Sequence, residues 1–311
     1  MVVGGGSSSL KTRYEISPLE ALVEDFGDAV TYERGYIGHI GTSYNNVSTG
    51  EDLSDPRSPS ELIADAVAAA ADADVIVFVG GLNKSKHQDN EGTDRYQITL
   101  PYGQEEVIEA LAATGKKLVA VNISGSPVAM PWADKANAIV QGWYGGTETG
   151  HALADVLTGR VNPSGKMPFT VPYSLEDGPL KTERQYPGIM EDGKDKVQEY
   201  YDEGVFVGYR WYCSQNITPQ FPFGYGLNYS SLTYGGLNMK ENGDTFDFTV
   251  DVTNELTLQS LYASYTEAVA GKEVTVTLTP YPEEATFNPA DIKLAFGLYV
   301  DPLTRRQNSE L

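Results

Sequence analysis

Apolar runs without polar alternation recur in the first half of the chain, and they restrict its fold more than any other feature. The runs are DVIVFVGG (74–81), KKLVAVNIS (116–124) and ANAIVQGWY (136–144). Such runs are typical of strands that are buried on both faces, as in a parallel sheet. Segments of helix formers precede or follow them, at 58–73, 103–115 and 147–159. The alternation predicts an α/β domain with a largely parallel sheet sandwiched by helices.

The pattern changes along the rest of the chain. Residues 1–175 carry the α/β pattern, and residues 176–229 are rich in Pro, Gly and Tyr. From 230 to 311, three segments place apolar residues at roughly every second position: SLTYGGLNMK, TFDFTVDVTN and KEVTVTLTPY. This spacing is typical of half-buried strands, so we expect a second, all-β module there. The final DPLTRRQNSEL looks like a tail.

Charge and composition exclude several classes of protein. The formal net charge is −21, from 22 Lys and Arg against 43 Asp and Glu, and nucleic-acid binding needs a basic face that this balance does not supply. A neutral or cationic partner agrees better with this charge. The chain contains no apolar run long enough to span a membrane, so we expect no membrane partner. Cys213 is the single cysteine, which excludes an intrachain disulfide.

A cluster of acids, HQDNEGTDR (87–95), follows the first buried strand. Ligands bind beyond the carboxyl ends of the strands in an open parallel sheet, so this loop is a candidate site. We expect Asp94 to form a structural ion pair with the adjacent Arg95, and Asp89 to be solvated. Glu91 has no adjacent cation and is the better candidate for a raised pKa and for catalysis; the alternative is a solvated loop.

Several motifs in a fixed order extend this argument. They are GLN…EGTDR…LPYGQEEVIEAL, VAVNISGSPVAMPW, AIVQGWYGGTETGHALADVLTGRVNPSGKMPFTVP, EYYDEGVFVGYRWY and FPFGYGLNYSSL. Their order resembles the C-terminal half of glycoside hydrolase family 3 β-glucosidases, over residues 1 to about 255. The resemblance implies an enzyme with a TIM-like barrel, an α/β sandwich domain and a fibronectin type III-like domain. Residues 230–311 would then be the last of these, in an incomplete or atypical form.

The resemblance also implies a mechanism. The glutamate of the family's EG-x-DR loop falls on Glu91, which would be the general acid/base of a retaining β-glucosidase. Retention requires a second carboxyl, roughly 5–5.5 Å away, as the nucleophile. That aspartate belongs to the barrel, and no barrel sequence is present here. We therefore expect half of an enzyme, with the barrel supplied by another chain or by a missing segment, and no cofactor.

Further residues allow two interpretations each. Trp143 either stacks on a sugar ring or is a core tryptophan, and His87 either binds a sugar hydroxyl or is a surface histidine. GGGSSS near the start lacks the spacing of a phosphate loop and resembles a turn at the family's domain interface.

The resemblance also implies a ligand and a location. The implied ligand is a β-glucoside or a short β-glucan oligosaccharide, and the implied location is periplasmic or secreted.

Other functions stay open. A β-xylosidase or another exo-β-glycosidase of the same family is the nearest alternative, because the residues that select the sugar would lie mostly in the barrel. A non-catalytic carbohydrate-binding module would keep both folds without the chemistry. A flavodoxin-like nucleotide binder is suggested only by the parallel-sheet pattern and is disfavoured by the acidity and the missing phosphate loop.

Overall fold

The computed structural model describes residues 4–8, 10, 12–38, 54–243, 245–256 and 272–278. The chain forms two compact units, the first from Met1–Ala154 with Met167–Phe223 and the second from Asp155–Lys166 with Gly224–Leu311. Residues 155–166 therefore group with the second unit, whereas the predicted boundary at 175 places them in the α/β domain. The predicted tail lies outside the described residues.

A three-stranded parallel sheet forms the centre of the first unit. Its strands are β1 (Val75–Gly81), β2 (Lys117–Ile123) and β3 (Ala138–Gln141), in the order β1-β2-β3. Both pairings are parallel, with β2 in the middle. Each strand lies within one of the apolar runs, which confirms the predicted parallel sheet. Because the strands are parallel, the loops that follow them leave from the same edge of the sheet.

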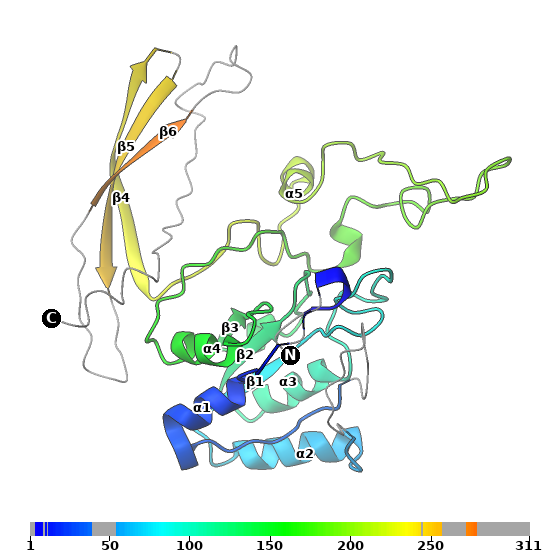
Figure 1. Ribbon diagram of the computed structural model, residues 1–311, viewed down its shortest axis with the longest axis vertical. Helices are drawn as coiled ribbons and strands as arrows, with labels where there is room; N and C mark the ends of the chain where they lie inside the picture. Colours follow the sequence, from blue (N-terminus) through cyan, green and yellow to red (C-terminus); the bar gives the residue numbers. More distant parts are fainter. Residues whose placement is uncertain are drawn as a thin grey trace. The chain divides into compact units, whose positions relative to one another are not determined.

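Helices cover both faces of this sheet. Two of them, α2 (Pro59–Ala70) and α3 (Gln104–Ala112), pack against each other and contribute to one apolar core with β1 and β2 (Figure 1). The core residues from these elements are Ala66, Ala70, Phe78, Val107, Ile108, Leu111, Leu118 and Ala120. On the opposite face, Leu153 of α4 (Thr149–Leu157) meets Val121 and Ile123 around Gly142. Among the described residues, no helix has both the length and the apolar character needed to cross a membrane.

Helix α1 (Pro18–Phe26) was not among the predicted helices. It begins with Ser17, whose side chain accepts a hydrogen bond from the Glu20 amide while the Glu20 carboxylate accepts one from the Ser17 amide. The same capping box, Ser-Pro-x-Glu, begins α2 at Ser58 and Glu61. This motif satisfies amides that the first turn of a helix leaves free, so S-P-L-E at 17–20 was the signal for α1.

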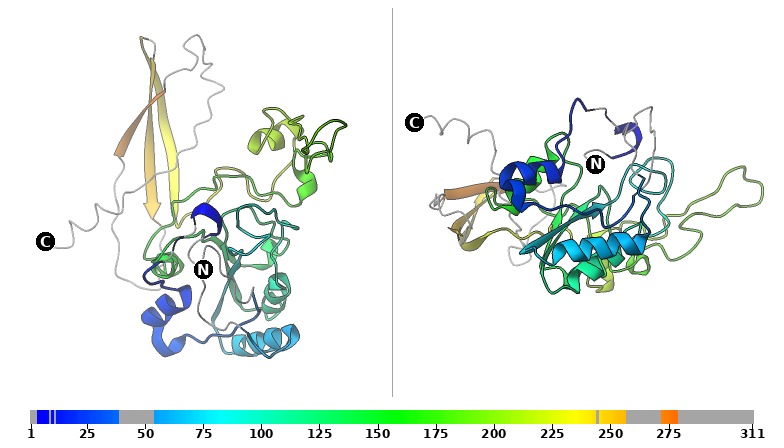
Figure 2. Two further views of the ribbon diagram at one scale, coloured as in Figure 1. Left: turned by 45° about the vertical axis from the view of Figure 1, so that its right-hand side comes forward. Right: turned by 90° about the horizontal axis from the view of Figure 1, so that it is seen from below.

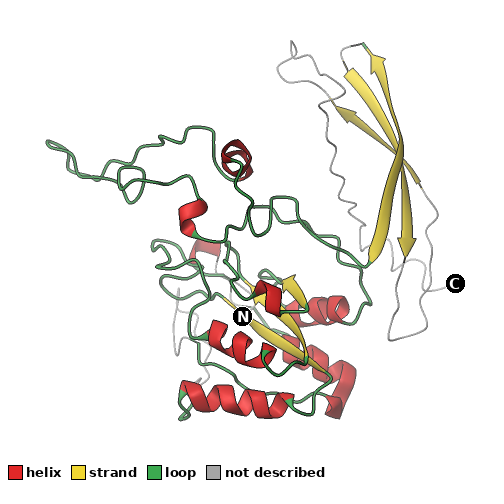
Figure 3. Ribbon diagram, turned by 180° about the vertical axis from the view of Figure 1, so that it is seen from behind, coloured by secondary structure: helices red, strands yellow, loops and turns green. Residues whose placement is uncertain are grey.

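Short 3₁₀ turns and one further helix complete the first unit and the segments that join its elements. The turns lie at Gly6–Ser8, Gly27–Ala29, Ala133–Lys135 and Leu175–Asp177. Residues 178–208 form a long loop that runs away from the parallel sheet (Figure 3). It ends at α5 (Tyr209–Gln215), which the sequence did not predict inside the Pro/Gly/Tyr-rich segment.

The described part of the second unit contains an antiparallel sheet. Its strands are β4 (Ser230–Asn242), β5 (Thr245–Leu256) and β6 (Lys272–Leu278), in the order β4-β5-β6. Along β5, Phe248, Val250 and Val252 are buried, as expected where alternate residues point to one face of a sheet. The three alternating segments are therefore strands, and their assignment to a fibronectin type III-like domain stays a prediction.

Candidate functional site

The loops that follow the three parallel strands meet at the carboxyl edge of the sheet. The loop after β1 carries the acidic cluster 87–95, and contacts of its Asp89 reach the loop after β2 and Tyr144 after β3. The turn Gly6–Ser8 lies against the same loop, where Figures 1 and 2 show it in dark blue. The acidic loop therefore lies at the strand ends, where the sequence placed it, and its role as a site stays a prediction.

Asp89 is the anchor of the acidic loop. Its Oδ2 accepts hydrogen bonds from the Gly125 amide at 2.6 Å and from the Tyr144 hydroxyl at 2.8 Å. The Ser126 hydroxyl donates to Oδ1, and the Gly5 amide donates to the main-chain oxygen of Asp89 at 2.9 Å. The expectation of a solvated Asp89 is therefore wrong, because the side chain is partly buried and accepts several hydrogen bonds.

Arg95 and Asp94 have different partners from those expected. Nη2 of the partly buried Arg95 donates to the Pro127 carbonyl at 2.5 Å. Asp94 is exposed and accepts a hydrogen bond from the Tyr186 hydroxyl. The predicted ion pair between Asp94 and Arg95 is wrong, because Asp94 is exposed and bonds Tyr186, whereas the partly buried Arg95 bonds the Pro127 carbonyl.

Glu91 is exposed at the tip of the loop. The Ser7 amide and the Ser7 hydroxyl each lie 2.5 Å from Oε2 of Glu91. Both contacts lower the pKa of Glu91, because both donors favour the carboxylate, and the hydroxyl contact has the larger effect. The expectation of a raised pKa for Glu91 is therefore wrong in this structure. Burial would raise the pKa, but Glu91 is exposed, so this effect is smaller than that of the two hydrogen bonds.

His87 is held inside the loop by both ring nitrogens. Nδ1 lies 2.8 Å from the Asp94 carbonyl oxygen, and Nε2 lies 2.8 Å from the Tyr96 hydroxyl. The His87 ring also stacks on Tyr96, with ring centroids 4.1 Å apart. A bond from His87 to a sugar hydroxyl would have to replace one of these contacts, so its role in binding stays a prediction.

Trp143 lies in the turn directly after β3. Its φ of 52° is uncommon for a bulky residue and marks a tightly constrained turn. The partly buried ring packs edge to face on Phe169, with centroids 5.5 Å apart. Trp143 is therefore neither a fully buried core residue nor a free surface residue, and sugar stacking stays a prediction.

The sequence did not predict the partners that hold the acidic loop. Ser126 and Tyr144 follow β2 and β3, so the rule that sites form at strand ends was a signal for both. Ser7 and Tyr186 lie 84 and 92 residues from the acids they bind, and no local pattern indicates those contacts. Among the described residues, no group of His, Cys, Asp and Glu side chains is arranged to hold a metal ion.

The structure thus places one exposed glutamate, Glu91, in the loop at the carboxyl edge of a parallel sheet. The model of the glycosyl hydrolase family 3 C-terminal domain matches residues 1–209. The chain belongs to glycosyl hydrolase family 3 and contains the family's C-terminal domain.

The relatives and solved structures described below are named as β-glucosidases. The chain is 42% identical over 276 residues to β-glucosidase BoGH3A of Bacteroides ovatus, covering 88% of this chain and 34% of the relative. It is 44% identical over 197 residues to a β-glucosidase of Rhizobium radiobacter, covering 62% of this chain and 23% of the relative. The chain thus spans at most about a third of these curated relatives.

Two crystal structures share the fold. A family 3 β-glucosidase of Bifidobacterium adolescentis matches with a TM-score of 0.67 and 30% identity, over 88% of this chain and 39% of that chain. The β-glucosidase of Kluyveromyces marxianus, solved in complex with glucose, matches with a TM-score of 0.61 and 32% identity. That match covers 73% of this chain and 29% of the other.

Proposed function

We propose that this chain supplies the general acid/base of a retaining β-glucosidase that removes terminal nonreducing β-D-glucosyl residues. The aspartate nucleophile would come from a barrel domain, on another chain or on a segment outside this sequence. The observation that supports the proposal best is Glu91, an exposed carboxyl held over the carboxyl edge of the sheet in a family 3 C-terminal domain. The names of the relatives favour glucose over xylose as the sugar. A periplasmic or secreted location stays a prediction.

Glu91 would act twice in each turnover. In the first step its protonated carboxyl gives a proton to the leaving glycosidic oxygen while the nucleophile attacks the anomeric carbon. In the second step its carboxylate takes a proton from the water that hydrolyses the glycosyl-enzyme.

The first step requires a protonated Glu91, but the two Ser7 donors favour its ionised form. A second carboxylate roughly 5–5.5 Å away and exclusion of water by bound sugar both act in the opposite direction. We therefore propose that docking of the barrel and sugar restores a pKa suited to a general acid.

The test is Glu91→Ala in this chain combined with a family 3 barrel domain. We expect hydrolysis of cellobiose to fall by roughly 10²- to 10⁴-fold, the usual contribution of general acid/base catalysis. A dinitrophenyl β-glucoside should still form the glycosyl-enzyme, because its leaving group needs no proton. Azide should then restore turnover by replacing water, and should yield a β-glucosyl azide, measured by mass spectrometry and NMR.

Asp72→Ala is the matched control. Asp72 is also an exposed carboxylate, but it lies just before β1, at the amino end of the strand. Its replacement should leave cellobiose turnover unchanged. Full cellobiose turnover by the Glu91→Ala variant would contradict the proposed role of Glu91.

A further inference from the structure

We propose that Asp89 is a positioning residue for Glu91, holding the acidic loop on the strand ends so that the Glu91 carboxyl can reach the glycosidic oxygen. This inference rests on the proposed function of Glu91. Asp89 itself would touch neither the sugar nor the reacting atoms. Asp89 lies two residues before Glu91, so it would act on Glu91 by fixing the backbone of the loop that carries both.

Three donors from the loops after two different strands bind the Asp89 carboxylate. The Gly125 amide and the Ser126 hydroxyl come from the loop after β2, and the Tyr144 hydroxyl comes from the turn after β3. Burial and the adjacent charge of Asp89 raise the pKa of Tyr144, so its hydroxyl stays protonated and donates. A carboxylate that accepts several hydrogen bonds in a partly buried position is held in one geometry.

Arg95 holds the other end of the same loop. Its guanidinium donates to the Pro127 carbonyl, the residue next to the Ser126 that binds Asp89. Burial lowers the pKa of Arg95, and the charge of Asp89 opposes that effect, so Asp89 supplies counter-charge to a partly buried cation. Asp89 and Arg95 thus attach both ends of the Glu91 loop to the consecutive residues 125–127.

Close backbone approaches support the same attachment. A Cβ added at Gly125 would lie 3.2 Å from the Tyr144 ring and 3.6 Å from Oδ2 of Asp89. A Cβ added at Gly5 would lie 3.0 Å from the Asp89 carbonyl oxygen. Gly5 therefore lets the main chain approach Asp89 directly, and Gly125 leaves room for the Tyr144 ring whose hydroxyl bonds Asp89.

The test compares Asp89→Asn with the unchanged chain, each combined with a family 3 barrel domain. Asparagine has the same shape but replaces one acceptor oxygen with an NH₂ group, which cannot accept from these donors. We expect kcat/KM for cellobiose to fall by about 10²-fold, the usual cost of a misplaced catalytic group. Turnover of a dinitrophenyl β-glucoside to the glycosyl-enzyme should change by less than about 3-fold, because that step needs no acid.

A double variant separates positioning from general destabilisation. If Asp89 acts through Glu91, adding Asp89→Asn to Glu91→Ala should cause no further loss, since the group that it positions is already absent. Tyr144→Phe and Ser126→Ala remove one donor each and should show smaller losses with the same dependence on leaving group. These two variants keep the test available if Asp89→Asn does not fold.

The outcomes distinguish this inference from the proposed function. Equal losses on both substrates, or additive losses in the double variant, would overturn positioning while leaving Glu91 as acid/base. Unchanged cellobiose turnover by Asp89→Asn would overturn it as well. Unchanged cellobiose turnover by the Glu91→Ala variant would instead contradict the proposed function, and this inference would fail with it.

Discussion

Glu91 shows how a single residue, Ser7, can set the chemistry of a carboxyl that it contacts. Glu91 is exposed, and by itself would have the pKa of an ordinary glutamate. The Ser7 amide and hydroxyl, each 2.5 Å from Oε2, lower that pKa. Ser7 therefore favours the base form of Glu91, which the second step of the proposed reaction needs and the first step does not.

Ser7→Ala should raise the pKa of Glu91. The substitution removes the hydroxyl contact, which has the largest effect on this pKa, and leaves the amide in place. An NMR titration of the Glu91 side-chain carboxyl in this chain alone should move to higher pH. Thr12→Ala is the control, because the Thr12 hydroxyl donates to Glu15 and not to Glu91. A Glu91 titration that stays in place, or moves to lower pH, would show that Ser7 does not stabilise the carboxylate.

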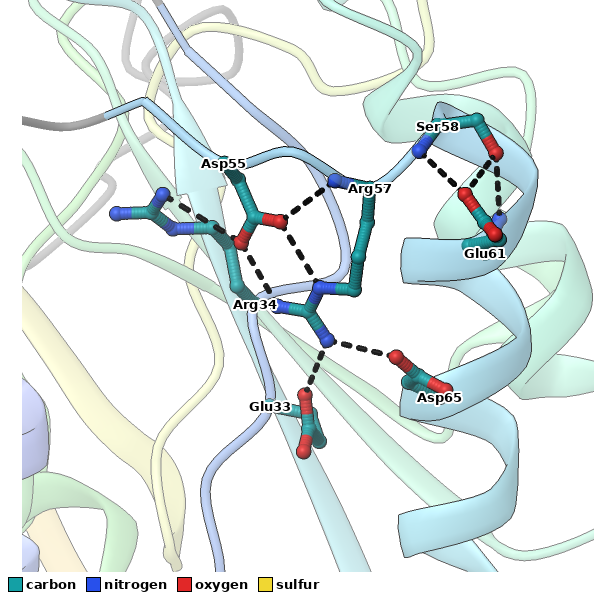
Figure 4. Close-up of polar contacts among 7 residues, drawn as sticks. All are labelled: Glu33, Arg34, Asp55, Arg57, Ser58, Glu61 and Asp65. Atoms are coloured by element: carbon teal, nitrogen blue, oxygen red, sulfur yellow. Dashed lines mark hydrogen bonds and ion pairs between the residues drawn. The ribbon is translucent and has the colours of Figure 1, made fainter.

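At the scale of elements, an ion cluster fixes the approach to α2. Figure 4 shows the Arg57 guanidinium between three carboxylates, from Asp55 at 2.8 Å, Asp65 at 2.7 Å and Glu33 at 3.2 Å. Asp65 lies on α2, and Arg57 directly precedes the Ser58 N-cap. The cluster therefore connects the irregular segment around Glu33 to the first turns of the helix.

Hydrogen bonds from the Arg57 side chain and amide lower the pKa of Asp55 to about 2. A lowered pKa means that the folded state binds the proton less readily than the unfolded state does. The stabilising contribution of Asp55 is therefore present above the ordinary aspartate pKa of about 3.9, and it is lost as the pH falls toward about 2.

Asp55→Asn should reduce the free energy of unfolding at pH 7 and have a much smaller effect near pH 2. Urea denaturation followed by circular dichroism at both pH values measures the difference. Asp72→Asn serves as the control, because Asp72 is an exposed carboxylate that is not among the partners of Arg57. The same loss of stability at both pH values would mean that Asp55 stabilises the fold without its charge.

At the scale of the whole molecule, this chain spans about a third or less of the family 3 relatives. A retaining mechanism needs two carboxyls on opposite sides of the bond that breaks, and this chain is proposed to supply one of them. The complete activity would then depend on the barrel, whichever polypeptide carries it.

The chain by itself should release no nitrophenol from a p-nitrophenyl β-glucoside. Addition of a family 3 barrel domain should produce release of nitrophenol. The same mixture made with Glu91→Ala should show how much of that rate depends on the acid/base. Absorbance of nitrophenolate measures all three. Turnover by the chain without a barrel would mean that the nucleophile lies within these 311 residues.

Local patterns in the sequence determined the parallel strands and the capped start of α2. The apolar runs around Val75–Gly81 and Lys117–Ile123 predicted a parallel sheet, because a strand buried on both faces cannot alternate with polar residues. The Ser-Pro-Ser-Glu box sets the start of α2, because a capping box acts over three residues. The position of the acidic loop at a strand end followed from the same pattern.

Only the tertiary structure decided which acid anchors the loop. The sequence favoured Asp94 with its neighbour Arg95, but Asp89 is the residue that binds Gly125 and Tyr144, 36 and 55 positions away. Ser7 meets Glu91 across 84 positions and reverses the expected direction of its pKa. A pKa and an anchor depend on which groups folding brings within hydrogen-bond distance, whereas a strand or a helix cap depends on neighbours along the chain.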